Sequence, residues 1–422
     1  MYSALNPAAL RSPRAVLANG RTTTARIPRT VLLLGLTSLF TDISSEMVVT
    51  ILPLYLVAVG GFSPLAFGLI DGIYNGAASV VQLASGYIAD RRNRHKPVAV
   101  SGYGLSAICK LLLVLAGTGL SAIGAIVLLD RVGKGIRTAP RDALISLSST
   151  PDRLGASFGV HRALDTVGAM LGPLLAFAML AAAPTAFNSV FTVSFCISLI
   201  GLGIIVLFVS GKPERPDGAQ PAPPASLKGA FALLKIPRYR ALLIAGAALS
   251  LATASDAFIF LVLRDYADLG TSMFPLLFVG SSAAYMLLAV PMGRLADRVG
   301  RARVLLGGYV LLLGVYATLL SGFHGWGIVV LALALLGSYY AATDGVLMAL
   351  GSTVVPDEMR GTGLAFLGTA TNVARLVASL AFGAAWTLLG TSAAIALFGG
   401  GLVLAGTLAA VVLHRTPEPA RA

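Results

Sequence analysis

The chain has 422 residues, of which 56% are hydrophobic and only 12% are charged, and its mean hydropathy is +0.85. This hydrophobic share is above that of ordinary soluble domains, which excludes a typical water-soluble enzyme or binding module. The formal net charge of +13 would suit a nucleic-acid ligand, but the basic residues gather in every second loop between apolar runs. We therefore expect a membrane protein that has the lipid bilayer as a partner and binds no nucleic acid.

Apolar runs long enough to cross a bilayer recur along most of the chain. They predict an all-α membrane protein with twelve transmembrane helices. The expected spans are 31–57, 65–88, 97–118, 121–142, 158–182, 187–209, 241–263, 273–296, 303–322, 326–350, 361–387 and 391–413.

A hydrophilic segment divides the spans into six and six. Its sequence, SGKPERPDGAQPAPPASLKG, is rich in Pro, Ala and charged residues and cannot form an apolar core, which is typical of a flexible linker. We therefore expect a disordered cytoplasmic arm, a first six-helix bundle, a cytoplasmic linker, a second six-helix bundle and a cytoplasmic tail. These parts comprise residues 1–30, 31–209, 210–240, 241–413 and 414–422, in that order.

The distribution of Lys and Arg predicts the orientation in the membrane. These residues are frequent in the arm, in the loop after the second span and in the linker, whereas loops such as GGFS at 60–63 and GTGLS at 117–121 contain none. Basic loops remain on the cytoplasmic side during membrane insertion. We thus expect both termini in the cytoplasm and the protein in a bacterial-type inner (plasma) membrane.

The two halves contain similar loops. GYIADRRNRHK at 86–96 aligns with GRLADRVGRAR at 293–303, which indicates an internal duplication of a six-helix unit. Such a duplication is typical of several transporter folds, whose binding site lies near the bilayer midplane where the halves meet.

The second loop, with its pattern G-x-x-x-D-R-x-G-R-x-R, resembles the signature loop of the major facilitator superfamily. The first loop has Asn93 where the pattern has Gly, and Asn tolerates positive φ better than most residues. The resemblance implies two six-helix bundles and a loop that latches the halves when the cytoplasmic side is closed. The expected cytoplasmic gating residues are Gly86, Asp90, Arg91, Gly293, Asp297, Arg298 and Arg301.

Two carboxylates interrupt the first span, in the stretch TDISSEM at 41–47. A charge at the centre of a transmembrane helix costs about 2.5–3.5 kcal/mol, so Asp42 and Glu46 require an explanation. At 1.5 Å per residue, Asp42 lies about 17 Å along its helix and Arg131 about 15 Å along the fourth span, and we expect them to pair near the midplane. Two carboxylates stacked beside a cationic helix can pass a proton along, because burial and neighbouring charges tune their charge state. A fixed ion-pair network that orients the helices is the alternative.

The fourth and fifth spans supply further charged and small residues. R-x-x-K-G-x-R at 131–137 resembles the fourth-span arginine motif of the superfamily, and GAMLGP at 168–173 resembles in part the fifth-span motif of exporting antiporters. Ala176 and Phe177 stand where that motif ends in two glycines, so the direction of transport stays open. We assign proton coupling to Asp42, Glu46, Arg131, His161 and Asp165, with packing as the alternative for His161, and helix packing to Gly168, Gly172 and Pro173.

Other polar residues within the spans are costly in lipid, so most of them should face a central cavity. Asp71 and Arg375 are two of these. Because most of the charge lies in the first half, we expect that half to couple protons and the second to offer an amphipathic substrate surface. The expected substrate-binding residues are Lys110, Lys134, Arg137, Arg162, Asp256, Tyr339, Tyr340, Asp344 and Asn372.

These features predict a proton-coupled secondary transporter that exports a small organic compound. The chain contains no P-loop for ATP. Uptake or exchange of an anionic metabolite or a carboxylate-bearing chelate is an alternative, since the cations can bind carboxylate or phosphate. A membrane enzyme or receptor is disfavoured, because no nucleophile, base and metal set and no soluble domain is evident. The single residues Cys109 and Cys196 do not suggest a metal site, and we expect a monomer without cofactor.

Overall fold

The computed structural model describes residues 27–92, 94–149, 154–210, 232–356 and 359–414, and within these ranges it is helical and contains no strand. The first half consists of α1 (Arg29–Leu54), a π-helical turn η2 (Tyr55–Val59), α2 (Pro64–Arg92), α3 (His95–Ala116), α4 (Leu120–Leu147), α5 (Leu154–Ala182) and α6 (Phe187–Phe208). The second half consists of α8 (Pro237–Leu251), α9 (Asp256–Tyr266), a 3-10 turn η4 (Thr271–Met273), α10 (Phe274–Val299), α11 (Arg301–Leu320), α12 (Trp326–Val354), α13 (Arg360–Leu389) and α14 (Thr391–His414).

The predicted all-α fold is confirmed, and every expected span except the seventh coincides with one helix, or in the first span with α1 and η2 together, to within a few residues. Ten segments in the described part of the chain are long and apolar enough to cross a membrane by length and composition alone, and these do not include α2 or α4. In α4 the charged residues between Asp130 and Arg141 account for this. Most of the predicted arm, linker and tail falls on residues 1–26, 211–231 and 415–422, outside the described residues.

The seventh span, predicted as one helix over 241–263, is instead broken into α8 and α9. Residues 252–255 are not helical, and Ser255 caps α9 by accepting a hydrogen bond from the Ala257 amide. Tyr316 on α11 satisfies the freed backbone, since its hydroxyl accepts from the Ala254 amide (2.8 Å) and donates to the Ala252 carbonyl (3.3 Å). Backbone groups at membrane depth require such hydrogen-bond partners. The break also places Asp256 at the first position of α9, inside the protein.

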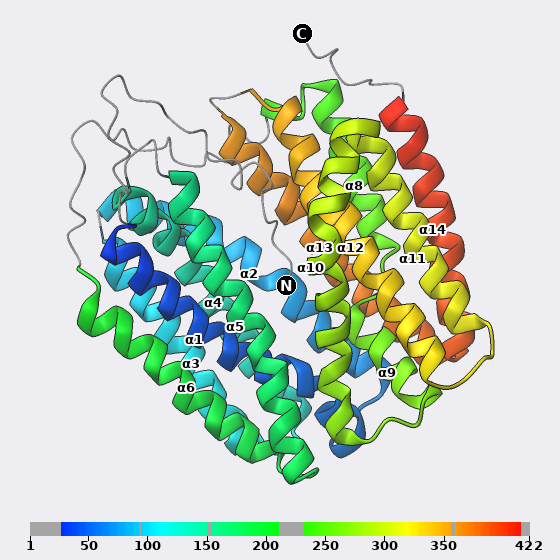
Figure 1. Cartoon of the computed structure of the whole chain (residues 1–422), viewed down its shortest axis with the longest axis horizontal. Coiled ribbons are helices and arrows are strands. Elements are labelled where there is room, and N and C mark those ends of the chain that lie inside the picture. Colours follow the sequence, from blue (N-terminus) through cyan, green and yellow to red (C-terminus); the bar gives the residue numbers. More distant parts are fainter. Residues whose placement is uncertain (1–26, 93, 150–153, 211–231, 357–358, 415–422) are drawn as a thin grey trace.

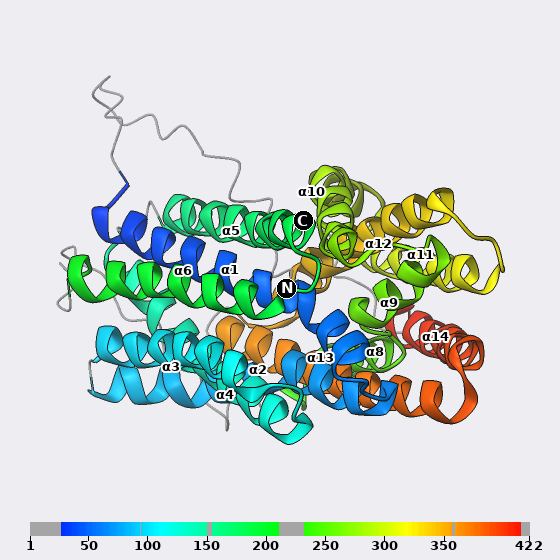
Figure 2. The ribbon, with the colours of Figure 1, turned by 90° about the horizontal axis from the view of Figure 1, so that it is seen from below.

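The helices form two bundles that diverge toward the end of the molecule where α6 ends and α8 begins, here called the linker end (Figure 1). At the opposite end, the far end, the bundles are in contact. Seen from below, α2 lies beside α13 and α5 beside α10 (Figure 2). The aromatic core crosses between the bundles there, because Phe258 packs against Phe67 of the first half and Phe382 of the second, each with ring centroids 4.8 Å apart.

Glycines bring α2 and α13 into backbone contact at the far end. A Cβ atom on Gly68 would lie 2.6 Å from the Ser379 carbonyl oxygen, and one on Gly383 would lie 2.4 Å from the Pro64 carbonyl oxygen. The Leu65 amide also donates to the Thr387 hydroxyl (2.9 Å). Small residues permit this close approach of two helices in a membrane, so the far end is closed by backbone packing.

The far-end contact predicts the effect of Gly383→Ala. The added methyl group meets backbone atoms, which cannot move aside as a flexible side chain does, so α2 and α13 should separate and the population should shift toward a state open at the far end. Spin labels on Ser63 and Ser392, in a protein lacking Cys109 and Cys196, measure the distance across this end by double electron–electron resonance. We expect a longer distance in Gly383→Ala and no change in Gly400→Ala, where a Cβ atom would meet nothing within 4 Å. Equal distances in both variants would refute the proposed closure.

Candidate functional site

A cluster of charged residues joins α1, α4 and α5 inside the first bundle. The Asp42 carboxylate on α1 lies 4.0 Å from the Arg137 guanidinium on α4 and interacts directly with the Asp165 carboxyl group on α5. Asp165 also lies 4.0 Å from Arg141 and accepts a hydrogen bond from Arg162 (3.4 Å). Two carboxyl groups therefore face each other between three helices, with guanidinium groups beside them.

The predicted pair of Asp42 and Arg131 is wrong. Arg131 bonds instead to Asp130, its neighbour in the chain, through Nε (3.1 Å) and Nη2, and its guanidinium lies over the Tyr74 ring, 4.0 Å from the centroid. Lys110 on α3 donates to the same carboxylate at 3.2 Å. The depth estimate placed Asp42 and Arg131 at one level of the membrane, but the α4 cation that approaches Asp42 is Arg137.

Glu46 and Lys134 lie next to the facing carboxyl groups. Glu46 is 4% exposed, and its Oε2 atom has no hydrogen-bond partner among the described residues. Lys134 on α4 interacts electrostatically with both Asp42 and Glu46. The other lysines and arginines predicted for proton coupling or substrate binding, which are Lys110, Arg131, Arg137 and Arg162, each have a described carboxylate within 4.0 Å. No carboxylate is found this close to Lys134 in the described ranges. Lys134 is thus near both acids but forms no close ion pair with either of them.

His161 and the glycines of α5 form the contact with α1. The buried His161 ring lies 3.0 Å from the Ser38 hydroxyl through Nε2, and Arg141 donates to that hydroxyl at 3.2 Å. Cβ atoms on Gly168 and Gly172 would lie 2.5 Å from the Leu39 carbonyl oxygen and 2.6 Å from the Glu46 Cβ. Pro173 follows within the same helix. These contacts hold α5 against the part of α1 that carries the two acids.

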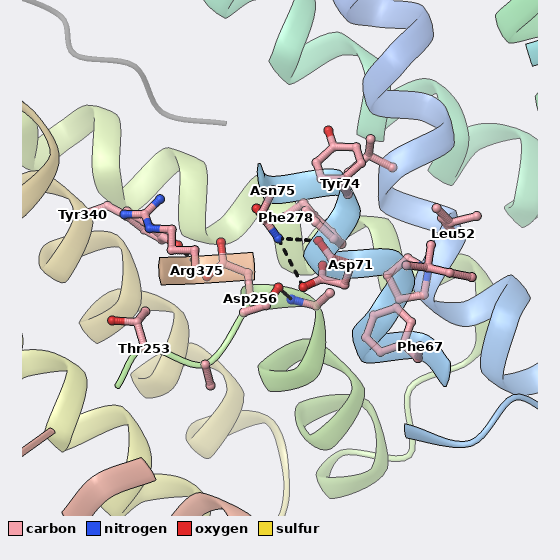
Figure 3. A pocket seen from close by; sticks show the side chains of 16 residues that line it. Leu52, Phe67, Asp71, Tyr74, Asn75, Thr253, Asp256, Phe278, Tyr340 and Arg375 are labelled. Atoms are coloured by element: carbon pink, nitrogen blue, oxygen red, sulfur yellow. Dashed lines mark hydrogen bonds between the residues drawn. The ribbon is translucent and has the colours of Figure 1, made fainter. Parts of the chain in front are cut away.

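A central cavity opens between the bundles, with about 890 Å³ of space not filled by protein atoms, its mouth included. Its polar lining comes from both halves (Figure 3). Asp71 on α2 accepts hydrogen bonds from Ser379 on α13 (2.6 Å) and from Asn75 (3.2 Å). Asp256 on α9 accepts one from the Tyr340 hydroxyl on α12 (2.7 Å). Arg375 on α13 also lines the cavity.

The predicted substrate residues divide between this cavity and its surroundings. Asp256 and Tyr340 line it, as Asp71 and Arg375 do, whereas Asn75, Tyr74 and Ser255 were not foreseen. A smaller adjoining cavity is lined by Lys110, Asp130 and Arg131, and it shares Val49, Leu52 and Tyr74 with the central one. The remaining members are not among the lining residues: Lys134, Arg137, Arg162, Tyr339, Asp344 and Asn372.

The predicted gating loop of the second half is well described. Gly300 has a φ of 109°, which Gly adopts readily, and Arg301 bonds to Asp297 (3.3 Å) and to the Ala349 carbonyl oxygen on α12 (3.1 Å). Gly293 and Arg298 lie in the last turns of α10. In the first half, Gly86, Asp90 and Arg91 lie in α2, but the surroundings of these three residues are not part of the described structure. Where they are described, the contacts of this loop stay within the second bundle.

Comparison with known proteins agrees with this architecture. The family model described as Major Facilitator Superfamily matches residues 34–278 and 257–422. The chain belongs to the major facilitator superfamily. It is 32% identical over 369 residues to an uncharacterised MFS-type transporter of Methanocaldococcus jannaschii, covering 86% of this chain and 89% of that protein. It is also 32% identical over 195 residues to an uncharacterised protein of Mycobacterium bovis, covering 46% and 47%.

Solved structures of superfamily transporters share the fold. The nucleoside transporter NupG has a TM-score of 0.75 at 16% identity, covering 91% of this chain and 99% of that one. A POT family transporter in complex with 5-aminolevulinic acid has a TM-score of 0.75 at 13% identity, covering 93% and 97%. The family model and the Methanocaldococcus jannaschii relative confirm the predicted superfamily, and the protein is a multi-pass membrane transporter. No group of three or more metal-binding side chains occurs in the described part of the chain.

Proposed function

We propose that the protein is a proton-coupled secondary active transporter that exports a small organic compound in exchange for protons. The observation that carries this proposal is that the Asp42 and Asp165 carboxyl groups lie next to each other, each 4.0 Å from a guanidinium group of α4. Two carboxyl groups in contact attract each other only when they share a proton, since two carboxylates repel. The occupancy of this site by a proton therefore decides whether α1 and α5 attract or repel at this depth.

The surrounding cations fit a site that changes its charge. Arg137 and Arg141 each stand 4.0 Å from one of the two acids, a distance longer than a charge-assisted hydrogen bond. On loss of the proton, either guanidinium can move closer and neutralise the second negative charge. Deprotonation thereby exchanges a carboxyl contact between α1 and α5 for ion pairs to α4, and protonation reverses the exchange, which gives the first bundle two arrangements.

On α1, Asp42 is followed by a second acid and then by residues that line the central cavity. Glu46 lies one helical turn from Asp42, and Val49 and Leu52, further along the helix, line the cavity. Lys134 interacts with both acids. In this scheme the proton site and the substrate site are both formed in part by α1. A movement of α1 on proton binding can therefore change the substrate site, which couples release of one ligand to binding of the other.

The alternative of an anionic substrate receives less support from the contacts. Three of the five predicted anion ligands, Lys110, Arg131 and Arg162, have a carboxylate of the protein within 3.4 Å, so an anionic ligand would have to displace it. The other two, Lys134 and Arg137, have no described carboxylate closer than 4.0 Å. Displacing a buried acid from its cation is costly. We therefore favour export of an organic compound by a monomer without cofactor over uptake of an anionic metabolite or chelate, and over a receptor or an enzyme.

Reconstituted vesicles test this function. The purified chain, inserted in vesicles with an imposed pH gradient, should accumulate or release members of a panel of lipophilic cations, zwitterions and polycarboxylates while protons move the opposite way. Collapse of the gradient by an ionophore should stop the accumulation. Transport that is unchanged without a gradient, or protons and substrate moving in the same direction, would contradict the proposed exchange.

We also propose an inner-membrane location with both termini and the linker end in the cytoplasm. The basic loops of the linker end support it, as do the far-end loops at 60–63 and 117–119, which contain no Lys or Arg; Arg264 near the end of α9 is an exception. In intact cells expressing a variant without Cys109 and Cys196, a cysteine at Ser63 should react with an impermeant external reagent and one at Arg94 should not. Reaction of the cysteine at Arg94 but not of the one at Ser63 would show that the orientation is the opposite of the proposed one.

A further inference from the structure

The central cavity contains opposite charges that are not paired with each other. Asp256 and Arg375, both from the second bundle, line it (Figure 3). They are near enough to attract each other electrostatically, yet no ion pair within 4.0 Å joins them in the described chain. An acceptor and a donor thus stand at one cavity with space between them.

Arg375 retains donors for an anionic group. Its nearest described carboxylate oxygen is that of Asp344, at 4.0 Å, which is beyond hydrogen-bond distance. Its Nε atom has no hydrogen-bond partner among the described residues, and its side chain is 30% exposed. A guanidinium group offers five N–H donors arranged to bind a carboxylate through two bonds. A ligand carboxylate would satisfy donors that the protein leaves open.

Asp256 is the better placed of the two cavity acids to bind a cation. Asp71 already accepts hydrogen bonds from Ser379 and Asn75 and is 9% exposed. Asp256 accepts from Tyr340 through Oδ1, and no donor to its Oδ2 atom is found in the described part of the chain. The free oxygen can accept a hydrogen bond from an ammonium group. With Asp71 and Asp256 ionised and Arg375 charged, the lining has a formal net charge of −1.

Aromatic rings form much of the remaining wall. Phe67, Tyr74, Phe278 and Tyr340 all line the cavity. Such rings bind apolar groups, and their faces also attract ammonium groups. Pockets of this composition hold an apolar ligand body while a few polar groups fix its orientation.

We propose that the transported compound is a small zwitterion with an apolar or aromatic body, whose carboxylate binds Arg375 and whose ammonium group binds Asp256. This assignment rests on the proposed transport function and names the class of its substrate. A singly charged compound of the same size leaves either the guanidinium donors or the carboxylate oxygen unpaired, and an unpaired buried polar group lowers affinity. The charges at the cavity therefore select for both ends of the ligand at once.

Equilibrium binding to the purified full-length chain tests the inference without a proton gradient. The probes are phenylalanine, phenethylamine and 3-phenylpropanoate, which share a phenyl body and differ in charge, together with leucine, isopentylamine and 4-methylpentanoate. Titration calorimetry should show each zwitterion binding at least roughly tenfold more tightly than either singly charged partner. Equal affinities within both sets, or no binding of either zwitterion below about 10 mM, would overturn the inference.

Two variants assign the ends of the ligand. Arg375→Gln should lower the affinity for the zwitterion and the acid but leave the amine unaffected, whereas Asp256→Asn should lower the affinity for the zwitterion and the amine only. Arg264→Gln and Asp265→Asn, which change the same residue types outside the cavity lining, should leave all affinities unchanged. If each cavity variant weakened all three probes equally, the assignment would be wrong. Because no gradient is involved, this result is independent of the vesicle test for proton coupling.

Discussion

Asp42→Asn should abolish transport driven by a pH gradient while leaving exchange of substrate across the membrane measurable. Asparagine resembles a carboxyl group that is permanently protonated, so it can remain beside Asp165 without repulsion. The first bundle would then keep one of its two arrangements, and the gradient would no longer change the site. Since the central cavity is lined by other residues, substrate binding should persist. The measurement is proton-driven flux and counterflow in the same vesicles.

The control for this prediction is Asp265→Asn, an exposed acid at the end of α9, which should transport as the parent does. Asp165→Asn should resemble Asp42→Asn, because two acids that share a proton titrate as a pair rather than singly. An Asp42→Asn protein that still concentrates substrate on proton drive would disprove the coupling role. A fixed ion-pair network predicts a different pattern, in which the variant loses expression, binding and exchange together.

Much of the fold could be predicted because apolar runs of spanning length mark most of the helices that cross a membrane. The break in the seventh span was missed, although Ser255 followed by Asp256 is a typical helix N-terminus. Its stability depends on the Tyr316 hydroxyl, which bonds the backbone of the break from a different helix. No pattern local to residues 241–263 reveals that partner.

The candidate site was predictable in its members but not in its pairs. The cost of a charge in lipid identified Asp42, Glu46 and Asp256 from the sequence. The bond between Asp71 and Ser379, by contrast, joins residues 308 positions apart, and only the contact of the two bundles creates it. The predicted pair of Asp42 and Arg131 was wrong for the same reason. Helical periodicity shows on which face of its own helix a residue lies, but it does not show which neighbouring helix that face contacts.

The largest effect on stability is expected from Asp130→Asn. This carboxylate binds both Lys110 and Arg131, whose side chains are 3% and 4% exposed. Its neutralisation leaves two buried cations close together without a counter-ion, which should cost about 3–5 kcal/mol of unfolding free energy. Thermal unfolding of the purified protein, followed by intrinsic fluorescence, should show a clearly lowered midpoint.

A second substitution tests whether the stranded charges cause this loss. Lys110→Met in the Asp130→Asn background removes one of the two unpaired cations, so the double variant should regain part of the stability, and the coupling between the two changes should be measurable in a double-mutant cycle. Asp142→Asn is the matched control: that side chain is 30% exposed and its partner Arg141 also lies near Asp165, so its loss should cost no more than about 1 kcal/mol. The prediction would be wrong if Asp130→Asn unfolded at the same midpoint as the parent, or if adding Lys110→Met destabilised the Asp130→Asn protein further. In either case water or lipid headgroups, rather than Asp130, would neutralise these cations.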